Sequence, residues 1–133
     1  LKNSDIITIH TPFSKETNGM IDERFFNIIK DDAIIINTSR GGIFDSLDTI
    51  EYFLKNKKNL RIATDVLPEE PPSTHSLLEQ WRRGDEWLDD RLIIMPHTAF
   101  YSEESCYELR KFSVDIIKTV FTGGKAYNIV NSV

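Results

Sequence analysis

The chain has 133 residues, of which 40% are hydrophobic and 28% charged, and its formal net charge is -5. This length suits one ordinary globular domain, or part of one, and is too short for two. The 16 basic and 21 acidic side chains are spread along the chain without a basic stripe, which argues against direct nucleic-acid binding. No apolar run is long enough to span a bilayer, so we expect no membrane association.

The chain contains one cysteine, Cys106. A single cysteine excludes an internal disulfide, and no C-x-x-C neighbour indicates zinc or a redox pair. We therefore expect a cytoplasmic protein. The first residue is Leu1 rather than methionine, and a strand-like run begins soon after it. This start predicts a piece of a longer protein.

Four short apolar runs, rich in β-branched residues, predict β-strands at residues 5–10, 33–39, 61–66 and 91–97. Helix-sized segments separate them, so the pattern predicts alternating strands and helices with a parallel sheet. The first three runs lack a strict alternation of apolar and polar residues. We therefore expect these strands to be buried on both faces of the sheet.

Capping residues mark the predicted helices between the strands. Asp22 can cap a helix with a core-facing stripe of Phe25, Phe26, Ile28 and Ile29, and Asp45 or Ser46 can cap a second. Residues 67–90 predict a long ordered loop with one short amphipathic stretch, residues 75–83. Ser102 can cap a final helix of about 20 residues that ends at the glycines 123 and 124.

Polar residues follow each predicted strand. In a parallel sheet the carboxyl ends of the strands lie along one edge, where open α/β sheets bind ligands. Each polar residue could also be an ordinary loop residue. The residues at these ends are His10, Thr11 and Pro12, then Thr38, Ser39 and Arg40, then Asp65, and finally His97 and Thr98.

Arg40 is the most informative of these residues. Its guanidinium offers a planar pair of donors suited to a carboxylate, and Gly41 and Gly42 would let the backbone turn tightly and come close to a ligand. The structural alternative is an arginine in a salt bridge with Asp45.

His97 follows a proline at the end of the fourth predicted strand, and an imidazole is a natural proton carrier for a carbonyl or alcohol. The alternative is a buried histidine satisfied by the backbone. Glu69 or Glu70 beside the imidazole would favour its protonated form and keep it available as an acid. The alternative for this pair is a solvated acidic loop.

Motifs for other chemistries are absent from the sequence. It contains no G-x-S-x-G elbow and no H-E-x-x-H, and the spacing of His10, His75 and His97 gives no metal-ligand pattern, so we expect no metal site. His75 is interpreted as a loop or helix-start residue. The G-x-G-x-x-G turn of dinucleotide-binding folds is also absent.

Four segments together resemble the successive motifs of the D-isomer-specific 2-hydroxyacid dehydrogenases, in the branch nearest the C-terminal binding proteins. The segments are TPFSKETNGMID, INTSRGGIFD, ATDVLPEEPP and MPHTAFYSEES. They occur in the family's order and cover nearly the whole chain. The blocks that contain the arginine, the glutamate and the histidine are far more specific together than any one of them.

The resemblance implies a role for each matching residue. Arg40 would hold the substrate carboxylate and carbonyl, Glu70 would pair with the histidine, and His97 would be the acid–base. Asp65 would meet the nicotinamide carboxamide. Arg40 and His97 would contact cofactor as well as substrate. The other implied contacts are Thr11, Pro12, Thr17, Thr38 and Ser39 along the cofactor, and Thr98, Ala99 and Phe100 beside the nicotinamide and substrate.

The resemblance also implies an organisation and a function. The fold would be α/β, the second half of a Rossmann-like doubly wound parallel sheet of about four strands plus a long C-terminal helix. Residues 1–101 would form the C-terminal half of the NAD-binding domain, and residues 102–133 a helix and tail of the substrate domain. The implied activity is NAD-dependent hydride transfer to a small 2-oxo acid, or from a 2-hydroxy acid, in a homodimer. The alternatives are an NAD-sensing, corepressor-like binding protein and a fragment inactive by itself.

Overall fold

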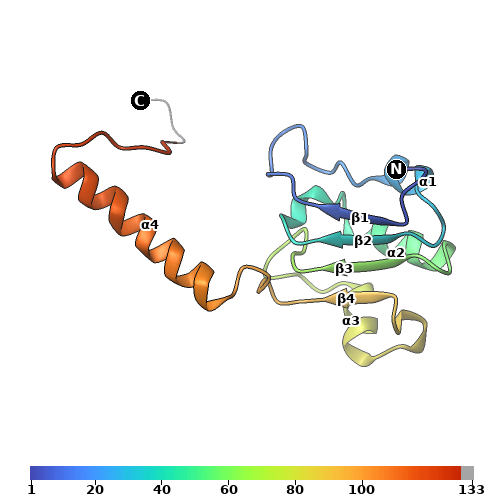
Figure 1. The fold of residues 1–133 in the computed structure, drawn as a ribbon. Helices are drawn as coiled ribbons and strands as arrows, with labels where there is room; N and C mark the ends of the chain where they lie inside the picture. The colour runs from blue at the N-terminus through green and yellow to red at the C-terminus, as the bar shows by residue number, and fades with distance from the viewer. Residues whose placement is uncertain (130–133) are drawn as a thin grey trace. The chain divides into compact units, whose positions relative to one another are not determined.

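The structure is a computed structural model that describes residues 1–129 (Figure 1). The chain divides into two compact units, Leu1–Ala99 and Phe100–Val133, and each is described by itself. The first unit contains the sheet and three α-helices, and the second contains one long helix.

The sheet of the first unit has four parallel strands in the order β1-β2-β3-β4. Neighbouring strands are paired so that Ile7, Ile35, Ile62 and Leu92 stand side by side across the sheet. The predicted α/β fold with a parallel sheet of about four strands is confirmed. The strands are β1 (Ile6–Ile9), β2 (Ile34–Asn37), β3 (Arg61–Thr64) and β4 (Leu92–Ile94).

The prediction that the first three strands are buried on both faces of the sheet is wrong. Burial alternates along the strands, so that Ile35 and Ile62 are covered while Ile6 and Ile93 are 58% and 55% exposed. The physical reason is that the hydrophobic core lies on one side of the sheet, where side chains of α1, α2 and α3 pack against the strands. Continuous apolar runs in the sequence therefore place aliphatic side chains on the other face as well.

Each of the three helices begins at a capping side chain. Asp22 accepts the N–H of Phe25 at the start of α1 (Glu23–Ile28), and Ser46 rather than Asp45 accepts the N–H of Thr49 at the start of α2 (Leu47–Asn56). Ile28 was predicted in the core but is 42% exposed, because it lies at the last position of the short α1.

In the segment predicted as a long ordered loop, the predicted amphipathic stretch at residues 75–83 is a helix, and a 3-10 turn that was not predicted lies beyond it. His75 caps α3 (Ser76–Arg83), and a 3-10 turn, η2 (Glu86–Leu88), follows it. His75 is therefore a helix-start residue, as predicted. The Trp81 indole donates to the backbone carbonyl of Leu92, 3.1 Å away, which ties α3 to β4. A part-buried anchor of this kind orders a segment whose local sequence carries many loop-forming residues.

The second unit consists of α4 (Glu103–Phe121) and the residues after it. Ser102 and Ser105 form a reciprocal capping box at its start, and Gly123 adopts a left-handed backbone with φ of 84° just after its end. The predicted long C-terminal helix is confirmed. None of its residues is buried. Within residues 1–129 no helix is long and apolar enough to cross a membrane. The predicted segment 102–133 ends in residues 130–133, which lie outside the described part.

Candidate active site at the carboxyl edge of the sheet

The carboxyl ends of β1 to β4 point to the same edge of the sheet, and the loops that follow them carry most of the predicted site residues (Figure 1). The edge is therefore assembled from segments that are far apart in the sequence.

Asn37 shapes the turn that presents Arg40. Its side chain is fully buried at the end of β2, where its Oδ1 accepts the backbone N–H of Ser39 at 3.0 Å and the Ser39 hydroxyl at 2.8 Å. Its Nδ2 donates to the carbonyl of Arg40 at 3.1 Å. Sequence reasoning gave Asn37 no role, although a lone polar residue that closes an apolar strand is a signal for such a turn.

The Arg40 side chain is exposed, and its Nη1 donates to the carbonyl of Ser39 at 2.7 Å. Among residues 1–129, no ion pair joins Arg40 to Asp45, so the alternative explanation of Arg40 as a salt-bridge partner is wrong. Asp45 instead accepts the Thr49 hydroxyl. The guanidinium can thus reach a ligand outside the sheet edge.

The two glycines after Arg40 face protein atoms, which corrects the expectation that they make room for a ligand. A Cβ on Gly41 would lie 1.7 Å from the carbonyl oxygen of Leu67, and a Cβ on Gly42 would lie 2.7 Å from the ring of Phe13. Gly41 therefore allows the loop after β3 to approach, and Gly42 the loop after β1. The 3-10 turn η1 (Gly41–Ile43) begins at this contact.

His97 and Glu70 form a close pair. The Nδ1 of His97 lies 2.7 Å from Oε2 of Glu70, and the other carboxylate oxygen, Oε1, accepts the backbone N–H of Leu67 at 2.8 Å. Glu69 binds Ser73 instead. The His97 side chain is 46% exposed, so the alternative of a buried histidine satisfied by backbone is wrong.

This pair decides which ring nitrogen of His97 is available for chemistry. An ionised carboxylate only accepts hydrogen bonds, so Nδ1 carries a hydrogen and Nε2 is left for a ligand. Nε2 can donate a proton when the ring is charged and accept one when it is neutral. Both residues also line a largely apolar hollow of about 470 Å³.

Asp65 ties the segment with His97 to the end of β3. Its carboxylate, on a residue only 5% exposed, accepts the backbone N–H groups of Thr98 and Ala99 at 2.8 Å each, one on each oxygen. Its backbone carbonyl accepts the N–H of His97 at 2.9 Å. His97 itself adopts a left-handed backbone with φ of 55°, a conformation that needs such support.

A hollow of about 210 Å³ lies beside these bonds, on the face of the sheet opposite the hydrophobic core. Four of the predicted cofactor contacts share its wall, and side chains of β2, β3 and β4 together with Met95 supply the rest. An apolar wall with one carboxylate at its edge fits a flat ring that carries a carboxamide, since each Asp65 oxygen keeps a lone pair for a further donor. The lining residues are Ile36, Thr38, Ala63, Thr64, Asp65, Ile93, Met95, Thr98 and Ala99.

The predicted contacts after β1 lie in a separate loop. The Thr17 hydroxyl donates to the carbonyl of Pro12 at 2.7 Å and accepts the N–H of Ser14 at 2.8 Å, so it holds the loop. The Thr11 hydroxyl oxygen is buried and has no hydrogen-bond partner among the described residues. A buried hydroxyl without a partner is costly, and a ligand group at this loop would satisfy it.

Phe100 belongs to the second unit, where it is 55% exposed and its carbonyl accepts a hydrogen bond from the Ser105 hydroxyl.

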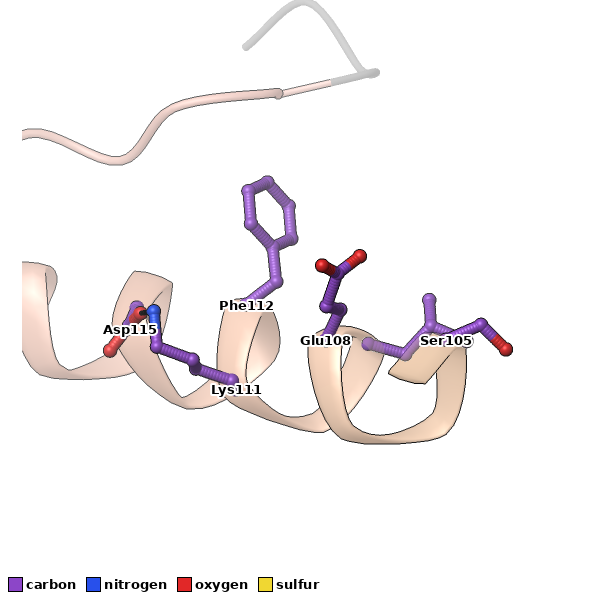
Figure 2. A pocket seen from close by; sticks show the side chains of 6 residues that line it. Ser105, Glu108, Lys111, Phe112 and Asp115 are labelled. Atoms are coloured by element: carbon purple, nitrogen blue, oxygen red, sulfur yellow. Dashed lines mark hydrogen bonds and ion pairs between the residues drawn. The ribbon is translucent and has the colours of Figure 1, made fainter. Parts of the chain in front are cut away.

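Figure 2 shows a hollow along one side of α4, where Lys111 and Asp115 form an ion pair at 3.2 Å. It contains none of the predicted site residues. Its lining is Ser105, Glu108, Leu109, Lys111, Phe112 and Asp115.

One further group of polar side chains, Asp48, Glu51 and His75, brings its ligand atoms within 4.8 Å of one another. Other bonds already occupy it, because Lys55 lies 2.6 Å from the Glu51 carboxylate and His75 Nδ1 accepts the N–H of Leu77. Burial raises the pKa of Glu51, but the bonds from Lys55, Ser76 and Gln80 outweigh it and bring that pKa below its ordinary value. Glu51 therefore pairs with Lys55 within α2, and the hydrogen bonds that it accepts from Ser76 and Gln80 join α2 to α3.

The family model, the related sequences and the related structures that match this chain all belong to one group of proteins. Residues 1–99 match the family model described as D-isomer specific 2-hydroxyacid dehydrogenase, NAD binding domain. A glycerate dehydrogenase of Methylorubrum extorquens is 34% identical over 132 residues, which cover 99% of this chain and 40% of that protein.

Two solved structures have the same fold with moderate sequence identity. D-lactate dehydrogenase of Aquifex aeolicus, in complex with NAD and lactic acid, has a TM-score of 0.74 and 31% identity, covering 92% of this chain and 39% of that one. The NAD complex of a D-isomer specific 2-hydroxyacid dehydrogenase from Lactobacillus delbrueckii ssp. bulgaricus has a TM-score of 0.78 and 28% identity. The matched region covers 98% of this chain and 41% of that one. The chain thus spans about two fifths of the length of these relatives.

Proposed function

Because the chain belongs to the D-isomer specific 2-hydroxyacid dehydrogenase family, we propose that it supplies the catalytic residues of an NAD-dependent oxidoreductase acting on a small 2-oxo or 2-hydroxy acid. The observation that carries this proposal is the bond between His97 Nδ1 and Glu70, which leaves Nε2 free at the carboxyl edge of the sheet. Relatives that carry names of dehydrogenases for glycerate, lactate and phosphoglycerate support it.

The cofactor would lie along the carboxyl edge of the sheet. The Asp65 carboxylate would accept a hydrogen bond from the carboxamide of the nicotinamide, and Thr98 and Ala99 would line the same hollow. The further contacts we propose are Thr11, Pro12, Thr17, Thr38 and Ser39. When bound, NADH would supply the hydride that reduces the keto carbon.

Arg40 and His97 would act on the substrate. The Arg40 guanidinium would bind the carboxylate in two-pronged fashion and orient the neighbouring carbonyl. His97 would donate a proton from Nε2 to the carbonyl oxygen as it becomes an alcohol, and Glu70 would stabilise the charged ring before that transfer. In the oxidative direction the neutral ring would accept the proton. Phe100 would contribute to the substrate pocket.

The organisation of the whole protein is also a proposal. Residues 1–101 would form the C-terminal half of the NAD-binding domain, and residues 102–133 would belong to the substrate domain. A homodimer and a cytoplasmic location complete the proposal. The corepressor-like alternative, and with it the branch nearest the C-terminal binding proteins, has no observation in its favour, since the named relatives are dehydrogenases.

The direct test uses a longer gene product that contains residues 1–133 together with their upstream sequence. We expect it to oxidise NADH in the presence of 2-oxo acids and to release the D-2-hydroxy acid, as chiral chromatography would show. Release of the L-isomer, or no turnover with any 2-oxo acid, would contradict the proposal. The 133-residue chain alone should bind NADH weakly or undetectably, because it has no glycine-rich turn for the pyrophosphate.

A further inference from the structure

A continuous path of backbone contacts joins the Arg40 turn to the Glu70–His97 pair. Gly41 directly follows Arg40, and a Cβ at this position would lie 1.7 Å from the carbonyl oxygen and 2.1 Å from the carbonyl carbon of Leu67. The contact is with backbone, which cannot swing away as a flexible side chain can. Gly41 is therefore the residue type that lets the two segments touch.

The same Leu67 residue holds the carboxylate of Glu70. Its N–H donates to Glu70 Oε1 at 2.8 Å, while Oε2 of the same carboxylate lies 2.7 Å from His97 Nδ1. The position of Leu67 thus sets the position of Glu70, and Glu70 sets the orientation of the imidazole.

On the other side of Gly41, the turn is equally fixed. The carbonyl of Arg40 accepts from the buried Asn37 side chain at 3.1 Å and from the N–H of Ile43 at 3.3 Å. Because these bonds hold the turn in place, the turn can absorb little of a displacement at the Leu67 contact. The displacement would be passed to Arg40 on one side and to Glu70 on the other.

We propose that Gly41 is a positioning residue that couples the Arg40 turn to the Glu70–His97 pair through the backbone of Leu67. The inference deepens the proposed function and rests on it for the roles of Arg40 and His97. The coupling would keep the carboxylate-binding guanidinium and the proton-transferring imidazole at a fixed distance and orientation relative to each other. Hydride transfer to a bound 2-oxo acid requires this arrangement.

The test compares Gly41→Ala with Gly42→Ala in the 133-residue chain by ¹⁵N NMR of the His97 ring. Gly42 is a matched control, because an added Cβ there meets only the edge of the Phe13 ring, at 2.7 Å. At a pH at which the ring is neutral, we expect the unmodified chain and Gly42→Ala to show the tautomer with hydrogen on Nδ1. In Gly41→Ala this signature should be lost in favour of the Nε2–H tautomer. An unchanged His97 signature in a folded Gly41→Ala chain would overturn the proposal.

A second pair of variants keeps the test decisive if Gly41→Ala does not fold. Coupling is reciprocal, so Glu70→Ala should move the amide resonances of Arg40 and Gly41 by way of Leu67. Glu69→Ala is the control, since Glu69 binds Ser73 and should disturb only that neighbourhood. Arg40 and Gly41 resonances that stay in place in Glu70→Ala would contradict the coupling.

These measurements need neither NADH nor substrate, so they separate the two proposals. If the resonances do not respond while variants of Arg40 and His97 abolish turnover in the longer gene product, the coupling is wrong and the function stands. If the resonances respond and no turnover is found, Gly41 links the two segments but the proposed function is wrong.

Discussion

Glu70 holds His97 through Nδ1 at 2.7 Å, whereas the adjacent Glu69 is bound to Ser73 and makes no bond to the imidazole. Two neighbouring carboxylates therefore have different partners, although both are exposed. The choice follows from backbone geometry, because the Leu67 N–H captures one oxygen of Glu70 and directs the other to the ring.

This difference predicts unequal effects of two equivalent substitutions in the longer gene product. Glu70→Gln removes the charged acceptor that orients the imidazole through Nδ1, and kcat should fall by roughly a hundredfold. Glu69→Gln should leave kcat within a factor of about two, as for a surface change without a charged partner. Steady-state kinetics with NADH and a 2-oxo acid measure both, and equal losses would contradict the assignment of Glu70.

Arg40 should matter for both binding and orientation of the substrate. Arg40→Ala should lower kcat/KM, and the loss should correspond to on the order of 3 kcal/mol of transition-state stabilisation, because the carboxylate loses its two-pronged partner. Arg40→Lys keeps the charge but not the planar pair of donors, so its loss should be intermediate. Near-normal kcat/KM for Arg40→Ala would show that another residue binds the carboxylate.

Asp65 should order the backbone after His97 even in the isolated chain. In Asp65→Asn the amide has a single oxygen, so one of the two N–H groups from Thr98 and Ala99 loses its acceptor and faces another donor. We expect faster hydrogen exchange at these two amides and a loss of stability of roughly 1–3 kcal/mol. Exchange rates that match those of the unmodified chain would mean that the loop is held by other contacts.

Glu51 should make stability depend on pH in the acidic range. Its pKa is lowered in the folded chain by its bonds from Lys55, Ser76 and Gln80, which together exceed the opposing effect of burial. Its contribution is therefore complete above the pKa of an unfolded glutamate and is lost as the pH falls through the folded pKa. Glu51→Gln should cost roughly 1–2 kcal/mol at neutral pH and progressively less in acid.

Urea unfolding of the chain across the acidic range measures this difference. Glu79→Gln on α3 is a suitable control, because Glu79 is exposed and its side chain makes no hydrogen bond among the described residues. A destabilisation by Glu51→Gln that stays constant with pH would exclude the ion pair as its cause.

The elements that could be predicted from the sequence are those specified locally. The four apolar runs contain the strands, and Asp22 and Ser102 start helices at the predicted positions, since a cap acts on backbone within three residues of itself. His97 and Asp65 could be singled out because they follow predicted strands, and Glu70 because a carboxylate in the loop between them can pair with the imidazole; the family motifs mark all three.

Contacts between distant segments could not be predicted in the same way. Arg91 donates to backbone carbonyls of Leu54, Lys57, Leu60 and Trp87, and nothing in the residues beside it indicates those partners. Gly41 was attributed to a ligand because its true neighbour, Leu67, lies in another loop. Burial on both faces of the sheet was inferred from apolar strands, whereas burial depends on which elements pack on each face.

The proposal that His97 transfers the proton is tested most directly by His97→Asn in the longer gene product. Asparagine keeps a polar side chain and tolerates the left-handed backbone at this position, but it cannot exchange a proton near neutral pH. We predict that NADH binding, measured by calorimetry, is retained while kcat for 2-oxo acid reduction falls by roughly a hundredfold to ten-thousandfold. Turnover that persists at the unmodified rate would contradict the account.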